Sequence, residues 1–177
     1  YDLEGIRTKK IDDFIEGLKN ASRTPIFREC VASALADLPH WSRWDEEAVR
    51  AITPNISASI TLSTLHGCPP AEIERIATYL IEEKGLHTFV KCNPTLLGYE
   101  FARKTMDAMG YGYLSFDDHH FREDLQYEDA LPMFRRLQER ADARGLAFGV
   151  KLSNTLPVDV TAHELPSEEM YMSGRAL

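Results

Sequence analysis

The spacing of apolar residues changes near residue 56. Before that point the chain reads as helical, because 11–18 and 25–38 carry apolar residues three or four positions apart, and a short helical run covers 45–52. Thr24 is placed to cap the second of these helices, ahead of a proline in its first turn. We therefore predict a helical lead-in segment over residues 1–55.

From residue 56 onward, apolar strands alternate with amphipathic helices. We predict strands at 57–63, 87–92, 111–116 and 147–152, and helices at 71–84, 98–109 and 127–144. Each of these helices is followed by a glycine suited to close it, namely Gly85, Gly110 and Gly145. The repetition of strand, helix, glycine and strand is typical of right-handed βαβ units with a parallel sheet.

The repeated units predict an α/β fold in which residues 56–177 form part of a (β/α)8 TIM-type barrel. A complete barrel needs about 250 residues, so four strands would supply roughly half of one. A small doubly wound sheet is the alternative, although neither G-x-G-x-x-G after a strand nor G-x-x-x-x-G-K-S/T occurs. Since the chain opens at Tyr1 and ends in 168–177, which reads as a helix just beginning, we expect a fragment of a larger multidomain protein.

Charge and cysteine content narrow the class of protein. The chain has 20 Lys+Arg against 28 Asp+Glu and a formal charge of −8, which argues against nucleic acid or an anionic membrane as a partner. No apolar stretch approaches the roughly 18 to 20 residues of a membrane helix. Its three cysteines include no C-x-x-C pair, so we expect no metal centre and no disulfide framework. A cytoplasmic protein is the expectation.

Two predicted strands end in nearly the same way. Lys91 is followed by Asn93 and a threonine, and Lys151 is followed by Asn154 and Thr155. Because parallel strands place their carboxyl ends at one edge, these groups and the loop at 63–70 should converge there. A cation beside amides and hydroxyls suits an anionic or electron-rich ligand. Either lysine could instead extend into solvent or pair with a carboxylate.

The run Asp117-Asp118-His119-His120 has the composition of a metal-binding cluster. Adjacent residues of an extended loop point in alternating directions, so such a run seldom supplies several ligands to one ion. We interpret it as a solvated loop and helix start. A metal-dependent hydrolase is the function that a metal cluster there would support.

Three motifs resemble the flavin barrel of dihydropyrimidine and dihydroorotate dehydrogenases. They are L-S-T-L-H-G at 62–67, P-A-E at 70–72 and F-V-K-C-N-P-T at 89–95, similar to that family's L-S-C-P-H-G loop and K-L-T-P-N strand end. Residues 61–70, 82–99 and 168–177 resemble more narrowly the large flavoproteins named as selenate reductase iron-sulfur subunits. Relatives of those are labelled glutamate synthase small-chain-like pyridine nucleotide oxidoreductases.

The resemblance implies bound FMN and assigns residues to it. Lys91 matches the lysine that contacts the isoalloxazine ring and stabilises negative charge on its reduced form. Asn154-Thr155 is similar to the family's N-T strand end, and Ser173-Gly174 to the turn after it. Asn93 and Lys151 complete the candidate flavin-binding residues. FAD, NAD(P)H and iron-sulfur clusters are expected only in other parts of the full-length protein.

The chain departs from the family at two places. Thr64 stands where the family has its catalytic cysteine, and threonine has no useful acidity near neutral pH. Cys68 is a possible substitute, so the candidate catalytic residues are Thr64, His66 and Cys68. An extra predicted strand and helix also separate the two lysine strands, which makes Lys151 compete with Lys91 for the flavin.

The leading hypothesis is a fragment of the flavin-barrel-like domain of a multidomain NAD(P)H-dependent iron-sulfur flavoprotein oxidoreductase. Its expected partners are a small-molecule substrate and other domains or subunits of the same enzyme. The alternative is a catalytically inactive barrel that serves as a docking or scaffolding module. Paired lysines favour the enzyme, whereas the missing cysteine favours the alternative, and the fold alone does not decide between them.

Overall fold

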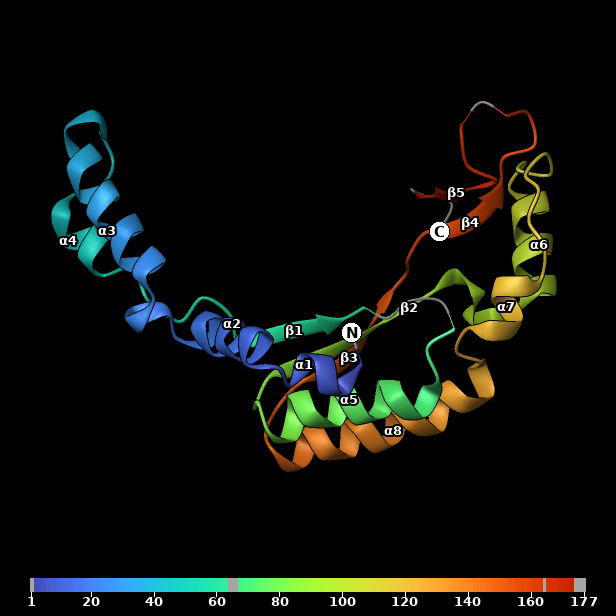
Figure 1. The fold of residues 1–177 in the computed structure, drawn as a ribbon, viewed down its shortest axis with the longest axis horizontal. Helices are drawn as coiled ribbons and strands as arrows, with labels where there is room; N and C mark the ends of the chain where they lie inside the picture. The colour runs from blue at the N-terminus through green and yellow to red at the C-terminus, as the bar shows by residue number, and fades with distance from the viewer. Residues whose placement is uncertain (1, 64–66, 164, 174–177) are drawn as a thin grey trace. The chain divides into compact units, whose positions relative to one another are not determined.

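The chain divides into two units, Tyr1–Ala58 and Ser59–Leu177, which are described separately below. The computed structural model describes residues 2–63, 67–163 and 165–173 (Figure 1). The division falls three residues after the boundary expected from the change in apolar spacing at residues 55 and 56.

The first unit is helical in its described residues. The second helix predicted from the sequence begins at Thr24, whose hydroxyl accepts a hydrogen bond from the Phe27 amide at 3.3 Å, with Pro25 in the first turn. This capping prediction is confirmed. The helices, including two short 3-10 turns, are α1 (Leu3–Ile6), α2 (Lys9–Lys19), η1 (Ala21–Arg23), α3 (Pro25–Asp37), η2 (Leu38–His40) and α4 (Glu46–Arg50).

The second unit contains a parallel sheet in the order β1-β2-β3, with β1 at Ser59–Leu62, β2 at His87–Cys92 and β3 at Phe148–Leu152. Helix α5 (Pro70–Glu82) connects β1 to β2. The connection from β2 to β3 is longer and holds η3 (Pro94–Leu97), α6 (Tyr99–Ala108), α7 (His119–Glu123) and α8 (Tyr127–Ala143).

The strand order and the helix positions distinguish a barrel from a doubly wound sheet. The three strands lie in chain order, and α5 and α8 pack side by side along the same face of the sheet (Figure 1). A doubly wound sheet has helices on both faces and a reversal of strand order, whereas a barrel winds in one direction with helices outside. The described strands therefore follow the barrel pattern, and the predicted fold class is confirmed.

The core of this unit lies between the sheet and the two long helices. Every second residue of β2 is buried, as expected for a strand with one covered face: Thr88, Val90 and Cys92. The helices bury stripes at helical spacing against that face. These are Ile73, Ile76, Ala77, Tyr79, Leu80 and Ile81 on α5, and Ala130, Met133, Leu137 and Ala141 on α8. The opposite face of the sheet, which carries the lysines, has no covering helix among the described elements of this unit.

The strand predicted at 111–116 does not form, and this prediction was wrong. Leu114 donates its amide to the Tyr111 carbonyl at 3.0 Å, so the chain turns there. The guanidinium of Arg103 donates to the carbonyls of Leu114 at 2.7 Å and Tyr111 at 3.2 Å. Because a side chain satisfies these acceptors, no ladder is needed to pair them. Strand β2 consequently pairs with β3 directly.

The end of the chain was also predicted wrongly, as the start of a helix. Residues Glu169–Met172 form strand β5, antiparallel to β4 (Leu156–Asp159). This hairpin and the segment from α6 to α7 together form a second apolar cluster. The buried members of the cluster are Ala102, Met106, Phe116, Phe121, Leu156 and Val158. Pairing with β4 supplies hydrogen bonds across strands that the local sequence alone does not reveal.

Candidate functional site

The register of the sheet places the two lysines next to each other. Lys91 of β2 is the partner of Lys151 in β3, and Phe89 is the partner of Gly149. Residues paired across parallel strands point to the same face, so both lysines project from the uncovered face. A Cβ added to Gly149 would lie 2.9 Å from the Phe89 ring, which confirms that this ring lies over the glycine on that face. The predicted convergence of Lys91 and Lys151 is therefore present.

Neither ammonium group has a carboxylate partner among the residues that the structure describes. Lys91 is half-buried and Lys151 is exposed. Their neighbours on the same face, Thr61, Phe89 and Gly149, are uncharged. Like charges directly opposite one another in a sheet repel, and a bound anion would relieve that repulsion.

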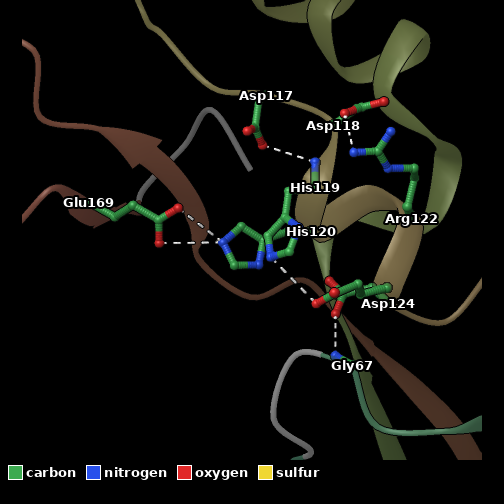
Figure 2. A network of polar contacts seen from close by, with 9 residues as sticks. Gly67, Asp117, Asp118, His119, His120, Arg122, Asp124 and Glu169 are labelled. Carbon is green, nitrogen blue, oxygen red and sulfur yellow. Dashed lines mark hydrogen bonds and ion pairs between the residues drawn. The ribbon is translucent and has the colours of Figure 1, made fainter.

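A buried carboxylate ties the strand-end loops together. Asp124, which follows α7, is only 5% exposed. One of its oxygens accepts a hydrogen bond from the Gly67 amide at 3.0 Å (Figure 2). The other oxygen accepts from the side-chain amide of Asn93 at 3.0 Å and from the Thr95 hydroxyl at 2.6 Å. The loops after β1 and β2 are thus fixed by a single charged side chain, through hydrogen bonds of the stronger, charge-assisted kind.

The same network extends to the loop after β3. The Asn154 side-chain amide donates to the side-chain oxygen of Asn93 at 2.8 Å. The side chain of Asn93 therefore accepts a hydrogen bond through its oxygen from the loop after β3 and donates one through its nitrogen to Asp124. As a result the two predicted asparagines lie together beside the lysine pair.

The remaining predicted site residues are not part of this hydrogen-bond network or lie outside the described ranges. Thr155 is half-buried directly before β4, and Ser173 is exposed directly after β5. Thr64, His66 and Gly174 lie outside the described residues.

Two cavities open at the carboxyl edge of the sheet. One, lined by Cys68, Lys91, Asn93 and Asp124 among others, encloses about 10 Å³, which is room for about one water molecule. The other has a volume of about 330 Å³ and an apolar lining that includes Leu97, Phe101 and Leu152. A ligand of cofactor size cannot enter the first cavity.

Cys68 is half-buried and Cys92 is buried, and burial affects the pKa of both thiols. Burial, together with the nearby negative charge of Glu72, raises the pKa of Cys68 above its ordinary value. Burial alone raises the pKa of Cys92 to about 11. Both thiols are therefore protonated at neutral pH, which disfavours a role as nucleophile.

The pKa of Cys92 predicts slow alkylation. At pH 8 a thiol of this pKa is about 0.1% thiolate, whereas an unperturbed one is roughly 25% ionised. We expect iodoacetamide to modify Cys92 at least about 100-fold more slowly than free cysteine, with a rate that rises about tenfold per pH unit between pH 7 and 9, because the thiolate fraction grows in that proportion below the pKa. Peptide mass spectrometry would follow the reaction, with exposed Cys30 as internal reference. Equal alkylation rates at Cys30 and Cys92 would contradict the raised pKa assigned to Cys92.

The histidine and aspartate run begins helix α7, as interpreted from the sequence. The Asp117 carboxylate accepts from the His119 amide at 2.9 Å, and Asp118 pairs with Arg122 at 3.0 Å (Figure 2). His120 faces Glu169 of β5 at 3.2 Å. In the described ranges, no group of three or more His, Cys, Asp and Glu side chains could hold a metal ion. The run thus joins α7 to the terminal hairpin.

Asp124 was not predicted from the sequence. Its immediate neighbours, Arg122 and Glu123, are both exposed and charged, and nothing in the local pattern distinguishes it from them. Its partners lie 57, 31 and 29 residues earlier in the chain. Only the folded arrangement reveals it.

Comparison with known proteins identifies the family. All of residues 1–177 match the family described as "Oxidoreductase YgfK, N-terminal TIM-barrel domain". The chain belongs to this family. Two curated relatives, from Escherichia coli strain K12 and Escherichia coli O157:H7, are both named "Putative oxidoreductase YgfK" and are 45% identical to the chain over 188 residues. The match covers 100% of this chain but 18% of each relative's length. No solved structure matches the chain significantly.

Family membership confirms the prediction of an oxidoreductase-related barrel at that level of detail. The chain corresponds to the N-terminal barrel region and spans less than a fifth of the relatives' length. Separately, none of the helices in the described ranges combines the length and the apolar character needed to cross a membrane.

Proposed function

We propose that this chain forms part of the flavin-binding barrel of a multidomain NAD(P)H-dependent iron-sulfur flavoprotein oxidoreductase. FMN would lie at the carboxyl edge of the sheet, and FAD, NAD(P)H and iron-sulfur clusters would belong to other parts of the longer protein. The observation that carries the proposal is the pair Lys91 and Lys151, side by side on an uncovered sheet face beside the linked amides of Asn93 and Asn154.

The residues at this edge fit a flavin. A flavin supplies hydride and electron transfer when bound. Lys91 offers a fixed positive charge for the electron-rich pyrimidine edge, and the half-buried position of its side chain strengthens that interaction. Asn93 is held in one orientation by Asp124 and Asn154, which suits a side chain that must present a fixed amide to a ring.

Cys68 is the candidate proton donor in this proposal. Threonine at position 64 lacks the acidity that the family's cysteine provides. Cys68 lines the small cavity together with Lys91, and its raised pKa keeps the thiol protonated. Because that cavity has room for about one water molecule, the thiol would donate through such a water and not by direct contact with the substrate. The acceptor would be of the kind that the resemblance suggests, a selenate-like oxyanion or a pyrimidine, with the other domains of the enzyme delivering electrons.

The test is FMN binding by the full-length protein. Lys91→Ala should weaken FMN binding at least about tenfold, because a hydrogen bond to a charged group contributes about 1.5 to 3 kcal/mol. Titration of FMN into deflavinated protein, followed by visible absorbance, measures this. Lys104→Ala, on the exposed surface of α6, is the matched control and should leave the affinity unchanged.

Unchanged FMN affinity in Lys91→Ala would overturn the placement of the flavin at this lysine. A full-length protein that neither contains nor binds FMN would overturn the flavin proposal as a whole, and would favour an inactive barrel that serves as a docking or scaffolding module.

A further inference from the structure

The second lysine is not explained by a flavin at Lys91. Lys151 lies opposite Lys91 in the register, on strands that are about 4.8 Å apart in a parallel sheet. One cation is enough for the pyrimidine edge of a flavin, so a second positive charge at the same edge calls for a second negative charge.

Asp124 lies near Lys91 at the small cavity, but no described acid pairs with Lys151. Lys151 forms no ion pair within the described ranges, although the whole chain carries a formal charge of −8 and acids are abundant elsewhere. Arginines of α8, by contrast, pair with acids of α5, as in Arg136 with Glu74 at 2.7 Å and Arg140 with Glu82 at 2.6 Å. Lys151 is thus left without an ion pair on a face whose other members include Ser59, Thr61, His87, Phe89 and Gly149.

The strand ends that carry the lysines are held firmly. Asn154, three residues after Lys151, is tied to Asn93, two residues after Lys91. Asn93 is in turn tied to buried Asp124. Because the strand ends are fixed relative to each other, an anion that binds both ammonium groups has to order only the two lysine side chains and not the backbone.

We infer that Lys151 binds the anionic oxygen of the substrate, a carboxylate or a small oxyanion, next to the flavin edge held by Lys91. This inference rests on the proposed flavin site and restricts its substrate to compounds that carry negative charge, held by Lys151. An uncharged substrate would leave the Lys151 ammonium group without a negative partner.

Sulfate and acetate are suitable probes, as a tetrahedral oxyanion and a carboxylate. In the FMN-loaded full-length protein, either anion should slow acetylation of Lys151 by an amine-reactive ester, measured by peptide mass spectrometry, while Lys104 stays unprotected. Calorimetric titration should show that Lys151→Gln weakens binding of the more tightly bound anion at least about tenfold, whereas Lys151→Arg changes it by less than about threefold. FMN content should fall much less in Lys151→Gln than in Lys91→Ala, because Lys91 is the lysine assigned to the flavin edge.

Two results would overturn the inference. One is acetylation of Lys151 at the same rate with and without either anion. The other is loss of FMN in Lys151→Gln with unchanged anion affinity, which would make Lys151 a ligand of the flavin. Failure of the proposed function is distinguishable, since a protein without FMN in which an anion still protects Lys151 would remove the flavin and retain the anion site.

Discussion

Replacement of Asp124 with alanine should detach the loops after β1 and β2 from each other. The change leaves three donors without their buried acceptor: the backbone amide of Gly67, the side-chain amide of Asn93 and the hydroxyl of Thr95. Hydrogen bonds to a charged group contribute about 1.5 to 3 kcal/mol each, and they are not additive, so we expect a local loss of about 3 to 5 kcal/mol. FMN affinity should fall with it if Asn93 faces the flavin as proposed.

Hydrogen exchange in the full-length protein measures this effect locally. The backbone amide of Leu96 donates to the Asn93 carbonyl, and that of Gly98 donates to the Thr95 carbonyl. These two hydrogen bonds close the η3 turn, which contains Thr95. If these amides exchange through local opening, a loss of 3 kcal/mol accelerates them by about a hundredfold. Peptides that cover 93–98 report the change.

Two variants control for the effect of substitution itself. Asp124→Asn keeps the shape and one acceptor but sets an N–H donor against at least one of the three donors, so it should give a smaller acceleration than alanine does. Glu123→Ala changes the adjacent, exposed acid and should give none. Equal exchange in Asp124→Ala and Glu123→Ala would contradict the role assigned to Asp124.

Features set by local periodicity were predicted correctly from the sequence. Helices α5 and α8 bury the stripes that their apolar spacing indicates, and each is followed by a glycine with positive φ, 64° at Gly85 and 66° at Gly145. The convergence of Lys91 and Lys151 was predictable for a related reason. Parallel strands bring their carboxyl ends to one edge whatever segments connect them.

Features that depend on distant partners were not predictable. The segment at 111–116 has an apolar strand-like composition, but Arg103 occupies carbonyl groups that a strand would use. Strand β5 exists because β4 pairs with it. Asp124 is selected by donors on two other loops. In each case the deciding interaction joins residues whose proximity the local sequence does not encode.

Leu137→Ala should be the most destabilising single change in the core between α5 and α8. Leu137 is fully buried on α8, one helical turn from the buried residues Met133 and Ala141 of the same apolar stripe. Truncation of a buried leucine costs about 2 to 5 kcal/mol, from lost transfer free energy and from the cavity left behind. The lower part of that range applies only if neighbours can collapse into the space, and the close approach of two helices against a sheet limits such movement.

Pulse proteolysis in urea, with cleavage sites mapped by mass spectrometry, isolates this unit within the full-length protein. With a urea dependence of about 1 to 3 kcal/mol per molar, the midpoint for cleavage within 127–143 should fall by about 1 to 2 M. Leu131→Ala is the matched control, because it makes the same change in helix propensity on the same helix at a side chain that is 39% exposed. A shift as large for Leu131→Ala as for Leu137→Ala would mean that packing between α5 and α8 does not hold the sheet in place, and the lysine pair on its other face would then lack the rigid support argued for it.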